Sequence, residues 1–331
     1  MSDSGEDEVS EVLKAESDEE GENEDLGRDE KNNSGGDQLE SCPLTQDILA
    51  RSLSLLCRTG NGLSHAYVRL DLKNKGLTDL ALLSSFIHLR YLDLSANHLS
   101  DFSPLAGLTQ LLWVKGDSNQ LHGFEGQPFG QLTFLQWLSI ASNRLFDVKG
   151  LGGPALETLN LTGNGIQTMQ GLEYPNLTNL VTLELRGNCL ETTDGIYLPN
   201  LRHLYLAQNN IKKLEGLEKL ERLITLHLRH NQLETLDGLT ANMKCLEYLN
   251  VRGNLISSMR ALQTLASVGQ TLKALVLLDN PIAKTDDYRL YVISQLPQLE
   301  RVDKDPITPE EKIEAQKKEF EDENAEDQED D

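Results

Sequence analysis

Nine asparagines recur along this chain in a setting where side-chain amides can satisfy buried backbone groups. They stand 21 to 26 residues apart, each in a stretch close to Leu-x-x-Leu-x-Leu-x-x-Asn-x-Leu: Asn97, Asn119, Asn143, Asn164, Asn188, Asn209, Asn231, Asn254 and Asn280. A carboxamide accepts through its oxygen and donates through its nitrogen, so each can pair backbone groups where the chain leaves a strand. Such a bond contributes about 1 kcal/mol net, whereas an unpaired group costs about 1–3 kcal/mol. We therefore predict an asparagine ladder inside a repeating fold.

The pattern around each asparagine requires stacked coils. We number the positions of the pattern as slots, counted from its first leucine. In one copy Leu204 and Leu206 occupy the fourth and sixth slots and alternate with polar residues, as in a strand with one apolar face. One copy cannot bury that face alone, so neighbouring copies must stack. Lys75 fills the asparagine slot at the front and makes ten copies. This periodicity predicts an α/β solenoid, a leucine-rich repeat horseshoe of about ten 22-residue repeats with a parallel concave sheet.

After each asparagine the apolar spacing changes to three residues. This spacing fits neither a strand nor a regular α-helix and predicts short 3₁₀-like turns on the convex side. Two runs show it: Leu99, Phe102, Leu105, Leu108 and Leu111, and Ile211, Leu214, Leu217, Leu220 and Leu223.

The third slot of each repeat places a side chain on the concave face, where we expect it to face solvent. The ten residues are Arg69, Tyr91, Trp113, Trp137, Thr158, Thr182, His203, Thr225, Tyr248 and Ala274. Tyr91, Trp113 and Trp137 stand on adjacent coils, and large aromatic rings often anchor protein interfaces. An alternative is that a tryptophan packs beneath the insertion at residues 122–130. Gly116 also departs from the pattern, because it stands where an inward leucine is expected.

A second group of candidate binding residues lies further along the concave face. The seventh slot supplies Arg186, Arg229 and Arg252, and the fifth supplies Tyr205 and His227. Such a surface suits an acidic or helical protein partner, because guanidinium groups pair with carboxylates and stack on rings. The same arginines could equally be ordinary solvated strand residues.

Both ends of the solenoid need caps. Residues 43–60 read as an amphipathic helix that begins with Thr45 as N-cap and ends at Gly60. Its Ile48, Leu49, Leu53, Leu55 and Leu56 are expected to cover the first coil. We place this helical cap at 43–66, the repeats at 67–287 and a C-terminal cap, a helix followed by a strand turn, at 288–306.

The net charge of −23 belongs to the two tails. Residues 1–40 carry 16 acidic against 3 basic side chains, and residues 304–331 carry 13 against 4. We expect residues 1–42 to be a disordered acidic tail, and 307–331 to form a charged helix, capped by Thr308, that leaves the cap and continues as an acidic tail. We expect no face to carry the strong positive field that nucleic-acid binding requires.

No catalytic, metal-binding or targeting motif stands out. The four cysteines are far apart, and we expect the seven histidines to be structural or on the surface. No phosphate-binding loop, nucleophile elbow or metalloprotease motif is present. With neither a signal peptide nor an apolar run of membrane-spanning length, we expect a cytoplasmic or cytoskeletal protein without a cofactor, metal, membrane contact or small-molecule substrate.

Several stretches are more specific than the repeat pattern. They are LLCRTGNGLSHAYV at 55–68, IHLRYLDLSANHL at 87–99, LLW at 111–113, LYLAQN at 204–209 and ALVLLDNP at 274–281. Over residues 43–303 the chain resembles the leucine-rich repeat-containing protein twenty-three family, radial-spoke components of motile cilia and sperm flagella. The resemblance implies a non-enzymatic scaffold in the spoke head of the axoneme, where it binds other radial-spoke proteins and is needed for ciliary and flagellar beating.

Two other functions remain open. The same short repeat class includes a nuclear regulatory subunit of protein phosphatase 1, which grips its enzyme through the concave face. The face here is richer in arginine, histidine and tyrosine than in acids, which argues against that function. A soluble factor for dynein preassembly is the third possibility.

Overall fold

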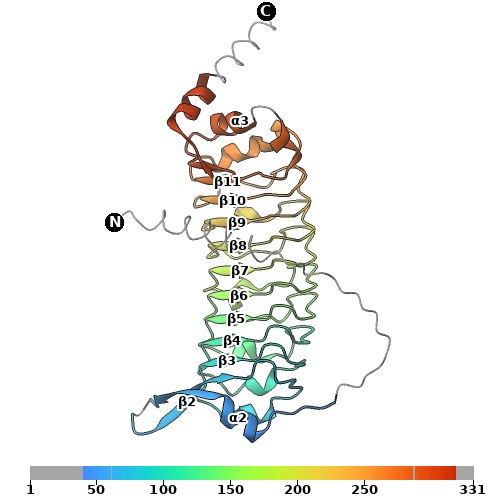
Figure 1. The fold of residues 1–331 in the computed structure, drawn as a ribbon, viewed down its shortest axis with the longest axis vertical. Helices are drawn as coiled ribbons and strands as arrows, with labels where there is room; N and C mark the ends of the chain where they lie inside the picture. Colours follow the sequence, from blue (N-terminus) through green and yellow to red (C-terminus); the bar gives the residue numbers. More distant parts are fainter. Residues whose placement is uncertain (1–39, 61, 286–287, 318–331) are drawn as a thin grey trace, which may run out of the picture. The chain divides into compact units, whose positions relative to one another are not determined.

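The computed structural model describes residues 40–60, 62–285 and 288–317. Within these ranges, thirteen strands form one sheet in chain order (Figure 1). Neighbours from β2 to β12 are parallel, whereas β1–β2 and β12–β13 are antiparallel. The strands are β1 (Leu53–Arg58), β2 (His65–Asp71), β3 (Tyr91–Asp93), β4 (Trp113–Lys115), β5 (Trp137–Ser139), β6 (Thr158–Asn160), β7 (Thr182–Glu184), β8 (His203–Tyr205), β9 (Thr225–His227), β10 (Tyr248–Asn250), β11 (Ala274–Val276), β12 (Arg301–Val302) and β13 (Asp305–Pro306).

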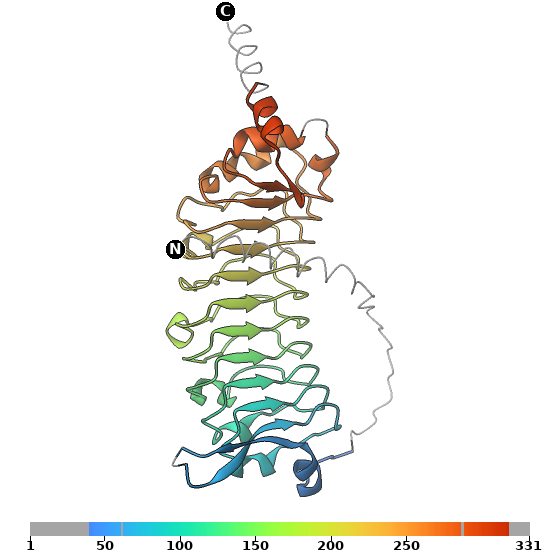
Figure 2. The same ribbon diagram turned by 60° about the vertical axis from the view of Figure 1, so that its left-hand side comes forward.

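The strand register follows the repeat slots. Each third-slot residue pairs with the third-slot residue of the next coil, as in Tyr91 with Trp113 and Trp113 with Trp137. The strands therefore lie one above another along the repeats (Figure 2). The sheet confirms the predicted leucine-rich repeat solenoid. We call the sheet face that is turned away from the leucine core the concave face.

Short helices lie on the other side of the core. The period-three residues of both quoted runs are buried there, with at most 4% of any side chain exposed. Most of the helices are short 3₁₀ turns, as predicted. Besides the C-terminal helix described below, the helices are α2 (Gln46–Ser52), η2 (Ala81–Ser85), η3 (Ser103–Leu105), η4 (Pro128–Gln131), η5 (Tyr174–Asn176), η6 (Leu217–Lys219), η7 (Met259–Val268), η8 (Pro281–Lys284) and α3 (Tyr288–Gln295).

The asparagines bond backbone groups of their own coil and of the coil before it. The Oδ1 atom of Asn209 accepts from the backbone N–H of Leu190 at 3.1 Å. Its Nδ2 donates to the carbonyls of Leu185 at 2.9 Å and Leu206 at 3.1 Å. The same pattern runs from Asn97 to Asn280, and each of these asparagines is buried.

The front cap differs from the expected single helix. Thr45 does cap α2, since its side chain accepts from the backbone N–H of Ile48, but the helix ends at Ser52 rather than Gly60. The chain then turns into β1, which pairs with β2 from Leu53 to Arg58. Leu49 is buried, but Leu55 and Leu56 are exposed and do not cover the first coil. Pairing with β2 outweighs the helical spacing of these leucines.

At the rear, Arg289 of α3 joins three segments of the cap. Its Nε donates to Glu311 Oε1 at 2.7 Å, and its Nη1 and Nη2 donate to the carbonyls of Val302 at 3.0 Å and Pro306 at 3.1 Å. The Arg289 guanidinium, followed by the backbone N–H of Thr308, lowers the pKa of Glu311 to about 2. These contacts hold the C-terminal helix against the cap.

The C-terminal helix, residues 309–317, begins with a capping box. The backbone N–H of Thr308 donates to Glu311 Oε2 at 2.8 Å, and the backbone N–H of Glu311 donates to Thr308 Oγ1 at 3.2 Å. Ala315 is 1% exposed, and Lys312 Nζ donates to the Pro297 carbonyl at 3.0 Å. The expectation that this helix leaves the cap is therefore wrong.

Asp303 completes the backbone pairing of the last repeat. Between ordinary coils, a sixth-slot N–H donates to the next strand, as Leu228 does to the Asn250 carbonyl at 2.7 Å. The corresponding N–H of Leu277 instead donates to Asp303 Oδ1 at 2.6 Å. Tyr288 donates its hydroxyl to the other carboxylate oxygen of Asp303.

Gly116, the departure from the leucine pattern, makes room for an aromatic ring. A Cβ atom added there would lie 3.0 Å from the ring of Phe102 and 3.0 Å from Ile140 Cδ1. Phe102 also contacts Phe129 of the insertion, with ring centroids 5.9 Å apart. The missing leucine is therefore replaced by a phenylalanine from the preceding coil.

The structure describes no residue before 40 and none after 317. The predicted disordered tail at 1–42 thus lies almost entirely outside the described residues, as does the acidic end of 307–331. Within the described ranges, no helix has the length and apolar character that a bilayer crossing requires.

Candidate functional site

The aromatic residues expected at the front of the concave face come together. Trp113 and Trp137 stack with ring centroids 4.6 Å apart and an interplanar angle of 9°. Both rings are half-buried and neither belongs to the leucine core, while Tyr91 on the neighbouring strand is 39% exposed. The three residues form an aromatic ladder, a rigid surface for apolar contact.

The insertion at 122–130 does not cover this ladder with its own aromatic rings. Its Phe124 and Phe129 are buried in the leucine core, with ring centroids 6.0 Å apart. These rings pack toward Phe102, on the core side of the sheet. The geometry therefore favours a contact surface over the alternative in which a tryptophan packs beneath the insertion.

An open cavity of about 350 Å³ lies beside the ladder. Tyr91 and Trp113 line it together with Arg69 and Asp93 of the concave face and Leu55 of the front hairpin, β1–β2. Leu55 was expected to cap the first coil, and its place in this cavity was missed. The hairpin residue therefore extends the candidate surface beyond the repeats.

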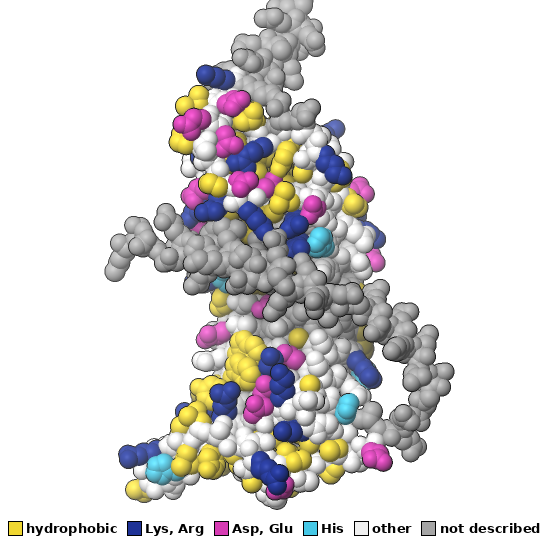
Figure 3. All heavy atoms as spheres, in the orientation of Figure 1, with side chains coloured by type: hydrophobic (Ala, Val, Ile, Leu, Met, Phe, Trp, Pro, Cys, Tyr) yellow, Lys and Arg dark blue, Asp and Glu magenta, His cyan; other side chains and the backbone are white. Residues whose placement is uncertain are grey.

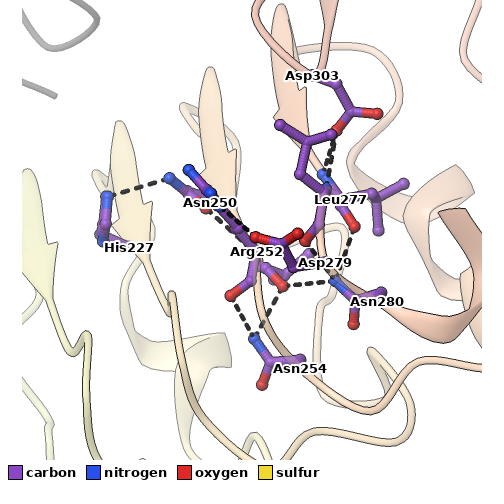
Figure 4. Close-up of polar contacts among 10 residues, drawn as sticks. His227, Asn250, Arg252, Asn254, Leu277, Asp279, Asn280 and Asp303 are labelled. Atoms are coloured by element: carbon purple, nitrogen blue, oxygen red, sulfur yellow. Dashed lines mark hydrogen bonds and ion pairs between the residues drawn. The ribbon is translucent and has the colours of Figure 1, made fainter. Parts of the chain in front are cut away.

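The arginines of the second group engage neighbouring polar side chains. Arg186 Nε donates to Gln208 Oε1 at 3.1 Å. Arg252 Nε donates to Asp279 Oδ2 at 2.6 Å (Figure 4). The bond from Arg252 lowers the pKa of the Asp279 carboxyl. Arg229 is half-buried. Part of the positive charge of this group is thus compensated within the chain by Asp279.

His230 lies beside this arginine group. Burial lowers the pKa of its imidazole, and the positive charges of Arg229 and Arg252 lower that pKa further. The neutral imidazole is therefore favoured, and His230 adds little positive charge to the surface.

His227 and Tyr205 lie in a packed row of rings. The His227 ring centroid is 6.0 Å from that of Tyr205 and 6.5 Å from that of Tyr248. Asn250 Nδ2 lies 3.1 Å from His227 Nε2 (Figure 4). His227 is 5% exposed. The third-slot residues Thr225, Tyr248 and Ala274 are also buried, so the expectation that every third-slot side chain faces solvent is wrong for these three.

The described residues contain no cluster of three histidine, cysteine or carboxylate side chains that could hold a metal ion. The cysteines are free, and Cys245 is exposed. The concave face therefore presents a candidate contact surface. The aromatic ladder supplies apolar groups at the front, and the arginine group supplies hydrogen-bonding groups further along.

Sheet, asparagine ladder and caps together define a leucine-rich repeat protein, a fold suited to protein binding. Residues 182–330 match a family model described as Leucine-rich repeat, and residues 88–108 match a second, Leucine Rich Repeat. The solved TLR13–ssRNA13 complex shares the fold, with a TM-score of 0.59 and 24% identity over 72% of this chain and 36% of that one.

Two relatives give a narrower assignment. Leucine-rich repeat-containing protein 23 of Bos taurus is 47% identical over 83% of this chain and 79% of its own length. The protein of that name from Homo sapiens is 48% identical over 82% of this chain and 78% of its own length. The chain belongs to the leucine-rich repeat-containing protein 23 family.

Proposed function

We propose that this chain is a non-enzymatic structural scaffold of the axonemal radial spoke. It binds other radial-spoke proteins in the spoke head through its concave face and is needed for ciliary, flagellar and sperm motility. Its working location is the cytoplasm and cytoskeleton, in the axoneme of the cilium or flagellum. The resemblance over residues 43–303 supports the location, and family membership supports the scaffold class.

The stacked Trp113–Trp137 pair is the observation that carries the binding role. A buried aromatic residue at the centre of an interface contributes on the order of 2–4 kcal/mol to binding. The two indoles remain half-exposed and stand outside the leucine core. Rings in this position contribute little to folding, whereas a partner that covers them gains most of their apolar area.

A double substitution tests this role. Trp113→Ala with Trp137→Ala should remove the protein from axonemes while shifting its thermal midpoint by no more than about 2–4 °C. The measurement is the fraction of protein that remains with salt-extracted axonemes, compared with wild type. Phe134→Ala is the matched control, because that ring is 54% exposed but lies outside the strands.

Two outcomes would count against the scaffold function. Normal axonemal retention of the double variant would show that the ladder is not the docking surface. Wild-type protein in the soluble fraction of salt-extracted cilia would instead favour the two other functions, a phosphatase regulator or a soluble factor for dynein assembly.

A further inference from the structure

Leu55 has an unusual backbone conformation at the edge of the sheet. Its φ angle is +59°, in the left-handed region that is unfavourable for a residue with a Cβ atom. The adjacent pairs Ser54–Arg69 and Leu56–Tyr67 place Leu55 opposite Val68, which is buried. Regular alternation would turn Leu55 to the core side with Val68, because directly opposite residues share a face. Leu55 instead lines the concave cavity with Tyr91 and Trp113.

With its side chain on the concave face, Leu55 connects the exposed apolar residues of the hairpin to the aromatic ladder, and together they form one apolar strip. Leu56 and Tyr67 lie opposite each other on the hairpin, 57% and 47% exposed, and Leu55 is 53% exposed. Hydrophobic side chains gather at this end of the molecule in Figure 3. We call Leu55, Leu56, Tyr67, Tyr91 and Trp113 the front strip. Exposed apolar surface of this extent commonly marks a protein interaction site.

The charged residues that line the cavity beside the front strip indicate the partner's chemistry. Arg69 lines the cavity and forms no ion pair with any described residue. Asp93, the other charged residue of the lining, accepts from the backbone N–H of Ser95 at 2.9 Å. A guanidinium beside an apolar cavity suits a carboxylate on a segment that also carries an apolar anchor.

The position of β1 indicates the partner's shape. β1 is the first strand of the sheet and, among the described strands, pairs only with β2. The outer edge of such a strand presents backbone donors and acceptors to an added strand. An extended segment laid along β1 can therefore gain backbone hydrogen bonds and bring a side chain to the cavity.

We propose that the front strip and the edge of β1 bind an extended acidic segment of a partner protein, whose bulky apolar side chain enters the cavity lined by Leu55, Tyr91 and Trp113. A carboxylate of that segment pairs with Arg69. The inference rests on the proposed function in one respect, the use of the front of the concave face for protein binding. A second copy of this chain is the alternative occupant, and the oligomeric state measured below distinguishes the two.

The test begins with a random 12-residue peptide library on phage, selected against the full-length protein. Enriched peptides should share a bulky apolar residue together with Asp or Glu. The two tryptophans of the chain both belong to the aromatic ladder, so intrinsic fluorescence reports binding of a synthetic enriched peptide at this place.

Two variants test the assigned contacts. Leu55→Asn removes the apolar side chain while keeping a residue that tolerates positive φ, and should weaken peptide binding at least tenfold. Arg69→Glu should weaken it similarly and shift selection toward peptides rich in Lys or Arg. Leu82→Asn, at an exposed leucine of η2 outside the cavity, should bind the peptide as wild type does.

Unchanged peptide affinity of Leu55→Asn, or enriched peptides without the apolar and acidic residues, would overturn the inference. So would a wild-type dimer in sedimentation velocity that Leu55→Asn dissociates, because the occupant would then be a second copy. If the wild-type protein binds no such peptide but is retained in axonemes, the acidic-segment inference is refuted and the scaffold function is not. If it binds the peptide but is found in the soluble fraction of cilia, the scaffold function is refuted and the acidic-segment inference is not.

Discussion

The two ends of the solenoid meet the same physical requirement in different ways. Both must cover an apolar coil that has no further neighbour. The rear cap does so with buried side chains and the bonds of Arg289, and even Ala315 of the last helix is buried. The front cap buries Leu49 but leaves Leu55, Leu56 and Tyr67 outside. The rear is thus built for stability, whereas the front keeps apolar surface that stability alone does not require.

The largest expected effect concerns the rear. Besides Ala315, removing residues 288–331 deletes five large buried apolar side chains and exposes the last coil; they are Val292, Ile293, Leu296, Leu299 and Val302. Each is worth about 1.5–3 kcal/mol, and their loss is comparable with the stability of a typical domain. We expect an aggregating product, measured as the soluble fraction after centrifugation. A variant that ends at Lys317 keeps every described contact and should stay soluble, and equal solubility of the two would refute the cap.

The second prediction concerns packing near the front. Phe102→Ala should lower the unfolding free energy by about 3–5 kcal/mol, because the ring is fully buried. Gly116→Leu alone should cost about 1–3 kcal/mol, since its side chain would overlap Phe102. In the double variant the leucine can occupy the emptied space, so it should be more stable than Phe102→Ala alone. Urea titration measures all three, and strictly additive effects would show that the two sites are not complementary.

The smallest effect should come from the ion pair between Arg289 and Glu311 in the rear cap, which we call the rear clamp. This effect should depend on pH. The pKa of Glu311 in the folded protein, about 2, lies below its ordinary 4.5. The ionised carboxylate therefore stabilises the fold above pH 4.5, and this contribution is lost as the pH falls from 4.5 to 2. Glu311→Gln should cost about 1–2 kcal/mol at pH 7 and flatten the dependence of stability on pH in that range. Glu310→Gln, the exposed neighbour, should leave the curve unchanged, and an equal effect from both would disprove the clamp.

Sequence periodicity predicted the parts of the fold that depend on local spacing. The third-slot pairs such as Trp113 with Trp137 appear in the expected register, and the period-three leucines are buried. The hairpin was missed because the spacing of Leu49, Leu53 and Leu56 also fits a helix, and only pairing with β2 decides for a strand. A short hydrophobic run carries no signal that separates these outcomes.

The binding surface was predicted only in part, for a related reason. Aromatic residues at one slot reveal the ladder, but nothing in the repeat pattern encodes the positive φ of Leu55. Asp303 and Arg289 likewise act on residues 13 to 26 positions away, at distances that no repeat pattern encodes. His227 and Tyr248 are buried and stack with ring centroids 6.5 Å apart, and the slot assignment does not include such contacts between neighbouring coils.

The asparagine ladder gives the repeat array a direction. Each asparagine completes its own coil and the one before it, so the first coil, which has no repeat before it, can carry Lys75 in that slot. The last coil has no following repeat, and Asp303 supplies the missing acceptor. A middle unit could therefore be duplicated or lost during evolution without leaving unpaired backbone groups, provided that the two terminal units remain. The number of middle repeats can therefore change with the length of the partner surface, whereas the two terminal units must be kept.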